Sequence, residues 1–221
     1  MNDLLDVIRG IKATIGANHN HNHNHNHRFK SWEHCYKFFK TFLDSDPKEG
    51  KRDRDLACLH LAFYLASWGM LRNSFLLEKD YKYHEHLIEI IEDSEITQNI
   101  EYTFDDNDKI WNLITRIRNE AYPGNTPTPT LITKILLGTL GCMPAYDDYF
   151  RAGIRQEPYG LSCTLSARNF KNEFSKFIEL ARDNQEQLAQ ARCILRTEEH
   201  NFDYLDMKII DMYFWEKGRP Q

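Results

Sequence analysis

The residues best suited to chemistry lie in one short segment, PAYDDYF, which runs from Pro144 to Phe150. It places two adjacent carboxylates, Asp147 and Asp148, among apolar and aromatic neighbours. A carboxylate in such a setting can stabilise positive charge that develops during a reaction. It can equally cap the N-terminus of a helix. Both interpretations of Asp147 stay open at this point.

A lysine and several aromatic residues could complete a site of this kind. Lys134 precedes the carboxylates in TLITKILLG, where its amine could attack a substrate or simply be a solvated helix residue. Aromatic side chains can stack on a flipped nucleobase, and basic side chains can contact phosphate. At helical spacing the same aromatic residues could belong to the core. The candidate binding residues are Trp32, His34, Tyr36, Trp68, Arg72 and Tyr146.

Other common chemistries lack their motifs in this chain. It has no GxxxxGK[ST], GxGxxG, GxSxG or HExxH. The alternating NHNHNHNHNH over 18–27 has no interleaved cysteine or carboxylate, so we expect no dedicated metal site there. A Mg²⁺-dependent nuclease would need a third carboxylate beside the aspartate pair, from Asp105, Glu120 or Asp211. We therefore expect neither a metal nor a cofactor.

Helical spacing of apolar residues dominates the elements that must position these side chains. No alternating strand of useful length occurs, so the sequence predicts an all-α fold. We expect Ser31 and Asp108 to cap helices. The predicted helical segments are 4–15, 31–43, 55–77, 81–91, 109–122, 130–141, 165–181, 183–195 and 204–217.

Segment 55–77 has the strongest helical pattern. Its apolar residues lie on nearly every face, which is typical of a central buried helix. Gly69 inside it costs roughly 1 kcal/mol relative to Ala. A close helix crossing at Gly69 would explain that choice.

Composition and charge indicate a folded intracellular protein. The 221 residues are 41% apolar, ample for a core, and the net charge of -5 argues mildly against a nucleic-acid binder. The five cysteines are scattered and odd in number, which favours reduced thiols in the cytoplasm. We expect no secretory leader and no membrane span. The expected organisation is an N-terminal helix over 1–17, an Asn/His low-complexity loop over 18–27 and a single helical domain over 28–221.

The segment from Lys134 to Phe150 resembles part of the helix-hairpin-helix DNA glycosylases. In that family a helix with a lysine or tryptophan near its start ends in a proline-rich turn, and an Asp-x-[His/Tyr]-apolar motif follows. Here Lys134, Pro144 and the run from Asp147 to Phe150 supply these parts. The segment KIIDMYFWEKG over 208–218 is similar to the closing aromatic helix of bacterial alkyladenine glycosylases. The chain also resembles an uncharacterised bacterial all-α family with SWEHCYxFF, LAFYLASWGM and GCxPAYDxYF blocks.

The resemblance implies a single-domain helical bundle of the glycosylase type that excises a modified base from DNA, with a role in defence against phages. Asp147, or Asp148 as the alternate, would stabilise an oxocarbenium-like transition state, with Lys134 close to the site. DNA would be the partner. The residues leave open a nuclease or nucleotide-processing helical enzyme that uses Mg²⁺ and a third carboxylate. They also leave open another alternative, a non-enzymatic helical module for protein–protein interaction. That alternative predicts an exposed apolar patch instead of a polar cleft.

Overall fold

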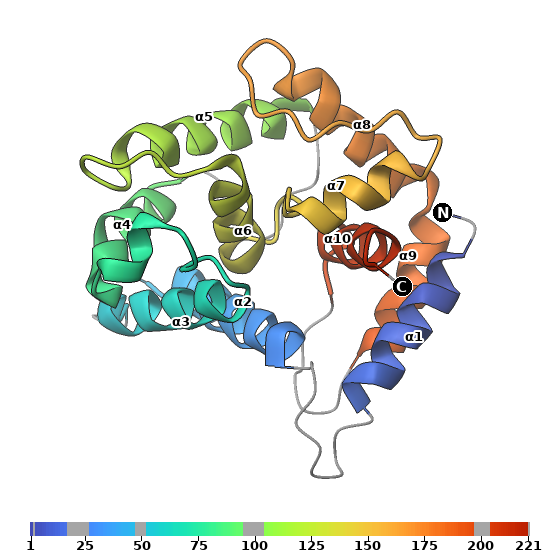
Figure 1. Cartoon of the computed structure of the whole chain (residues 1–221), viewed down its shortest axis with the longest axis horizontal. Helices are drawn as coiled ribbons and strands as arrows, with labels where there is room; N and C mark the ends of the chain where they lie inside the picture. The colour runs from blue at the N-terminus through green and yellow to red at the C-terminus, as the bar shows by residue number, and fades with distance from the viewer. Residues whose placement is uncertain (2, 17–26, 47–51, 95–103, 197–203, 221) are drawn as a thin grey trace. The chain divides into compact units, whose positions relative to one another are not determined.

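The computed structural model describes residues 1, 3–16, 27–46, 52–94, 104–196 and 204–220. These residues form ten α-helices and two short 3₁₀ helices without any strand, which confirms the all-α class (Figure 1). The chain divides into two compact units. We call Met1–Asn26 with Met143–Gln221 the split unit, and His27–Cys142 the central unit. No helix in the described part of the chain is long and apolar enough to cross a membrane.

The described residues of the central unit form five α-helices, and local caps set several of their starts. Asp53 caps α3 by accepting a hydrogen bond from Leu56 N at 2.9 Å, and Thr128 caps α6 by accepting one from Leu131 N at 3.2 Å. Helices α2 and α3 lie side by side (Figure 1). The elements are α2 (His27–Asp44), α3 (Arg54–Ser67), η3 (Phe75–Glu78), η4 (Tyr81–His84), α4 (Glu85–Glu92), α5 (Phe104–Glu120) and α6 (Pro129–Thr139).

Helix α6 is the most deeply buried helix of the central unit. Every residue from Leu131 to Thr139 is buried. A Cβ added to Gly138 would lie 2.4 Å from Cε1 of Tyr64. Gly138 therefore allows the Tyr64 ring of α3 to approach the α6 backbone closely.

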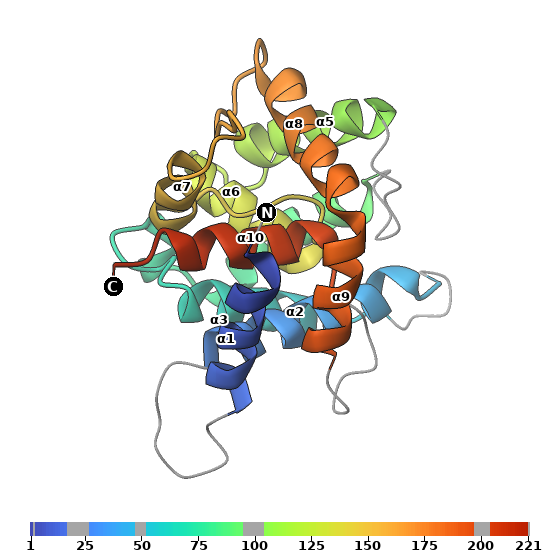
Figure 2. The same ribbon diagram turned by 90° about the vertical axis from the view of Figure 1, so that its right-hand side faces the viewer.

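The split unit packs four C-terminal helices with the first helix of the chain. Helix α10 is its centre, since all its residues from Met207 to Trp215 are buried. Helix α1 lies beside α9 (Figures 1 and 2). The sequence set this first helix apart from domain 28–221, but it packs with the C-terminal helices. The elements are α1 (Leu4–Gly16), α7 (Asp148–Arg155), α8 (Phe170–Asp183), α9 (Gln185–Leu195) and α10 (Asp206–Lys217).

The predicted helix over 55–77 is wrong in its length and in its burial. Helix α3 ends at Ser67, and Gly69 then takes a positive φ of 75°, a conformation that glycine adopts without strain. No described atom lies within 4 Å of a Cβ added to Gly69, so none of the described helices crosses there. One face of α3 is open, with Leu56, Leu59 and Phe63 exposed at 41%, 43% and 61%.

Several predicted helix starts are displaced by about one turn. Ser31 does not cap α2, because that helix begins at His27 and the Ser31 hydroxyl donates to the Arg28 carbonyl at 2.7 Å. Asp108 lies inside α5, which begins at Phe104. Helix α8 begins at Phe170 instead of Leu165. Of the Asn/His segment, 18–26 lies outside the described residues.

Candidate functional site

Asp147 is the N-cap of α7. Its side chain accepts a hydrogen bond from the backbone N–H of Phe150 at 3.0 Å. This bond satisfies one of the N–H groups that the first turn of a helix leaves without a partner. Asp147 is half-buried, whereas Asp148 is exposed. The cap role of Asp147 is thus confirmed, and it holds the carboxylate in one orientation.

A buried ion pair in α10 holds the turn that precedes Asp147. Asp211 accepts a hydrogen bond from the Ala145 N–H through Oδ1 at 3.0 Å, and its Oδ2 lies 2.9 Å from Lys208 Nζ. The side chains of Lys208 and Asp211 are 0% and 3% exposed. Buried charges persist when they have such partners. The pair therefore anchors the backbone at Ala145, two residues before Asp147.

Tyr146 belongs to the aromatic core of the split unit. Its ring stacks on Phe150 and Phe177, with centroids 5.9 and 6.0 Å apart. Burial raises the pKa of its hydroxyl well above the ordinary value. Only 1% of Tyr146 is exposed, so in this structure its ring is a core element and is not open to stack on a base.

Two arginines follow Asp147 in α7, and one thiol lies within electrostatic reach of all three residues. Arg151 Nε donates to the Tyr146 carbonyl at 3.0 Å, and Arg155 is exposed one turn later. Burial raises the pKa of the Cys163 thiol to about 12; Arg151 and Arg155 act to lower it, and Asp147 acts to raise it. All three charged groups are therefore within electrostatic reach of Cys163.

Lys134 lies in the second turn of α6, not at the start of the helix as expected. Only 2% of it is exposed, and its Nζ lies 4.0 Å from the centre of the Trp68 ring. This is a close cation–π contact. A nucleophilic lysine must reach its substrate, and here the residue is covered.

The other predicted aromatic residues of the central unit are also buried. Trp32 stacks on Tyr36 with ring centroids 5.2 Å apart, and its Nε1 donates to the Leu137 carbonyl at 2.9 Å. Trp68 Nε1 donates to the Arg28 carbonyl at 3.1 Å. These bonds satisfy the indole N–H groups inside the core.

Among the candidate binding residues, His34 and Arg72 are the exposed ones. His34 lies on α2, and Arg72 lies in the turn after α3. Lys134 and Trp68 contact each other, as do Trp32 and Tyr36, all within the central unit. Asp147, Asp148 and Tyr146 belong to the split unit. The predicted residues are thus divided between the two units.

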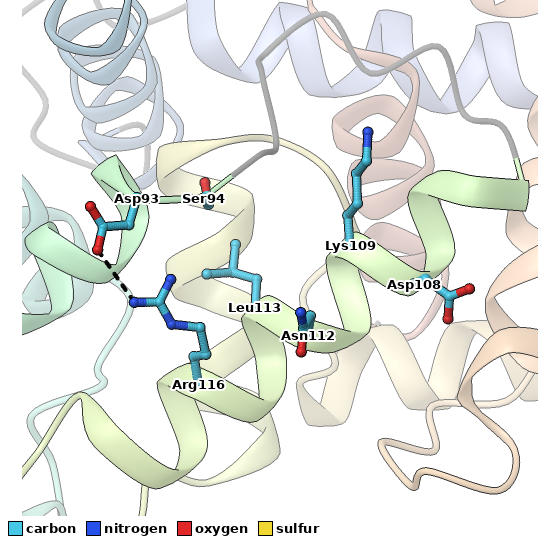
Figure 3. A pocket seen from close by; sticks show the side chains of 7 residues that line it. All are labelled: Asp93, Ser94, Asp108, Lys109, Asn112, Leu113 and Arg116. Carbon is cyan, nitrogen blue, oxygen red and sulfur yellow. Dashed lines mark hydrogen bonds and ion pairs between the residues drawn. The ribbon is translucent and has the colours of Figure 1, made fainter.

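A depression of about 360 Å³ lies beside α5 in the central unit. Figure 3 shows Arg116 pointing to Asp93, at 3.5 Å, while the side chains of Asp108 and Lys109 diverge. None of the predicted site residues lines this depression, and its two acidic and two basic groups offset each other. The lining residues are Asp93, Ser94, Asp108, Lys109, Asn112, Leu113 and Arg116.

Sequence reasoning missed the residues that hold the Asp147 segment in place. Lys208 and Asp211 carry a signal, since a lysine and an aspartate three residues apart interrupt an otherwise apolar helix. The sequence signal for Arg151 and Arg155 is weaker: they follow Asp147 by four and eight residues, which is helical spacing. In the part of the chain that the structure describes, no group of three His, Cys, Asp or Glu residues could hold a metal ion.

Comparisons with known proteins add no assignment. No protein-family model, curated protein or solved structure matches the chain. Functional inference for this protein therefore depends on its local motifs and on the geometry described above.

Proposed function

We propose that the chain is a DNA N-glycosylase-like hydrolase with Asp147 as its catalytic carboxylate. The observation that carries the proposal is the fixed orientation of that carboxylate, held by the Phe150 N–H and by a turn that Asp211 anchors. A preorganised carboxylate stabilises the positive charge that develops on the sugar as the glycosidic bond breaks. The order of helix, turn and capped helix over 129–155 is also the order that the resemblance implies.

Arg151 and Arg155 support an anionic substrate. They follow Asp147 by four and eight residues, so all three lie along one side of α7. Arginine side chains beside a catalytic carboxylate can hold the flanking phosphates of DNA. The overall charge of -5 does not oppose this, because binding follows the local field.

The proposed reaction is hydrolysis, without a lysine-linked intermediate. Lys134 is 2% exposed and faces the Trp68 ring. A lyase would need its amine at the sugar carbon. In the proposed hydrolysis, a water molecule oriented by Asp147 attacks the sugar carbon as the base leaves, and the product is an abasic site.

The test is a screen of the full chain against DNA duplexes that carry modified bases, with abasic sites read as alkali-labile breaks. Asparagine caps a helix as well as aspartate does, so Asp147→Asn removes the charge and keeps the fold. We expect a loss of about 100-fold or more in rate, the scale of one lost electrostatic contact. Asp148→Asn, at the exposed neighbouring position, is the matched control. Unchanged activity in both variants, or no abasic sites from any duplex, would contradict the proposal.

A second candidate function is a helical interaction module, and the exposed face of α3 favours it. Leu56, Leu59 and Phe63 are exposed at spacings of three and four residues. Soluble helices usually present charged residues on the side that faces water. A contiguous apolar stripe there is typical of a protein-binding surface.

This candidate can be tested by photo-crosslinking in cells. A photoreactive phenylalanine at position 63 should form a protein adduct that the same residue at position 77 does not form. Leu77 is a suitable control, because it is 64% exposed on η3 of the same unit. The candidate fails if position 63 gives no adduct.

A further inference from the structure

The open face of α3 has the spacing of a helix-pairing seam. Leu56, Leu59, Phe63 and Ala66 follow one another at intervals of three, four and three residues, and Ala66 is exposed as well. This is the a/d spacing through which two helices pack. After Asp55, no charged residue occurs in α3. The face therefore offers about three turns of uninterrupted apolar contact.

The opposite side of α3 explains why this face stays open. Ala57, Cys58, Leu61, Tyr64 and Leu65 are the buried residues of the helix. They point away from the seam residues, because each buried residue lies roughly 100 to 180° around the helix axis from the middle of the seam. One side of α3 thus satisfies the core, and the apolar residues on the other side have no role in it.

Helix α2 borders the seam with positive charge. The ring of Phe38 stacks on His60 of α3, with centroids 4.2 Å apart. His34 lies within electrostatic reach of His60, and Lys37 follows His34 by three residues on the same side of α2. The exposed charged residues of α2 before Asp44 are all basic: Arg28, Lys37 and Lys40.

We propose that the α3 seam binds an amphipathic helix of a partner protein, with leucine-type residues along its contact line and acidic residues along the edge that meets α2. This rests on the second candidate function and names its partner class. The apolar line complements Leu56, Leu59 and Phe63, and the acidic edge complements Lys37. A second copy of this chain fits less well, because it would bring the same basic row instead of its complement.

The probe is a pair of labelled 21-residue helical peptides that share leucines at alternating three- and four-residue spacing. One peptide has glutamates beside the leucines, and the other has lysines there. Fluorescence anisotropy with the full chain should show tighter binding of the glutamate peptide. Phe63→Ser should weaken that binding at least tenfold, while Leu77→Ser, the control at an equally exposed residue, leaves it unchanged.

Charge reversal tests the acidic edge separately. Lys37→Glu should weaken binding of the glutamate peptide and favour the lysine peptide, whereas Lys40→Glu, on the side of α2 away from α3, should not change the preference. Equal binding of both peptides, or binding that Phe63→Ser does not alter, overturns the proposal. So does a dimer in sedimentation experiments that Phe63→Ser abolishes, because the occupant is then a second copy. If position 63 forms crosslinked adducts but the glutamate peptide does not bind, the proposal of an acidic partner helix is wrong and the interaction module stands. If neither experiment gives a signal, both proposals are wrong.

Discussion

At the scale of single residues, the cap at Asp147 predicts a clear difference between two substitutions. Asp147→Ala removes the acceptor for the Phe150 N–H, and we expect a loss of about 1 kcal/mol in the free energy of unfolding. Asp147→Asn should stay within a few tenths of wild type, since asparagine accepts the same bond. Urea denaturation of the two variants measures the difference. Equal destabilisation by both would show that the charge, not the hydrogen bond, stabilises the start of α7.

The buried pair in α10 predicts a larger effect. Asp211→Ala leaves Lys208 charged in a buried position and leaves the Ala145 N–H without its acceptor. Loss of one partner of a buried pair typically costs about 3–5 kcal/mol. Glu216→Ala is the control, because its pair with Arg219 is solvent-exposed and such pairs contribute about 1 kcal/mol or less. Similar losses in both variants would contradict the anchoring role of Asp211.

At the scale of elements, the contact of α7 with α10 depends on a glycine. A Cβ at position 153 would lie 1.8 Å from the Phe214 carbonyl oxygen, so Gly153→Ala must push the helices apart. We expect a loss of several kcal/mol, at the upper end of what overpacking usually costs. Gly10→Ala in α1 meets nothing within 4 Å and should be neutral or stabilising by about 0.5–1 kcal/mol. Calorimetric melting temperatures would compare the two variants, and an unchanged melt for Gly153→Ala would rule out the close approach.

Apolar periodicity predicted the helical class and most of the helices, because core-facing residues of a helix recur every three or four positions in the sequence. The predicted segments 4–15 and 183–195 match α1 and α9 to within two residues at each end. Periodicity failed over 55–77, where the apolar pattern continues through the turn that begins at Trp68. Gly69 indicated the end of the helix there, but a glycine inside an apolar run can equally indicate a close contact between two helices.

The candidate site was only partly predictable, because burial depends on contacts far apart in the sequence. The cap at Asp147 is a local feature and could be read from the motif. The cover over Lys134 comes from Trp68, 66 residues earlier, and the anchor at Asp211 comes 64 residues after Asp147. No local pattern reports such contacts. The exposed face of α3 was missed for the same reason, since periodicity cannot tell a second apolar face from a core face.

At the scale of the whole molecule, the two units should respond to acid at different pH values. His84 of the central unit is buried, with Nδ1 2.8 Å from the Tyr122 hydroxyl oxygen, and burial lowers its pKa to about 4. Between its unfolded pKa of about 6.5 and that value, the unfolded state binds a proton that the folded state does not. Stability present above pH 6.5 is therefore lost as pH falls, by about 3 kcal/mol in total.

His84→Gln tests this pH dependence, because glutamine can bond to Tyr122 but does not titrate. Urea unfolding at intervals from pH 7.5 to 4 should give a flatter profile for the variant than for wild type. Parallel profiles would show that His84 does not titrate on unfolding.

The split unit should keep the stability that its Asp3 carboxylate contributes down to a lower pH. Partial burial alone would raise the pKa of Asp3, but hydrogen bonds from Lys217 and Tyr213 outweigh it and lower the pKa below 3.8. A carboxyl with a lowered folded pKa contributes stability above its unfolded pKa and loses it as pH falls through the folded one. Hydrogen exchange followed from pH 6 to 3 should thus show α4 losing protection before α10. The reverse order would contradict both assignments.

The split unit also has a consequence for synthesis on the ribosome. The central unit is continuous, so its helices emerge in uninterrupted succession. Helix α1 emerges before this unit, but its partner α9 begins at Gln185, 169 residues after α1 ends at Gly16. At typical translation rates of about 5–20 residues per second, α1 waits roughly 10–30 s with Leu4, Ile8 and Ile11 uncovered. Nascent chains stalled before residue 185 should therefore recruit chaperones at α1, and release of the full chain should end that contact.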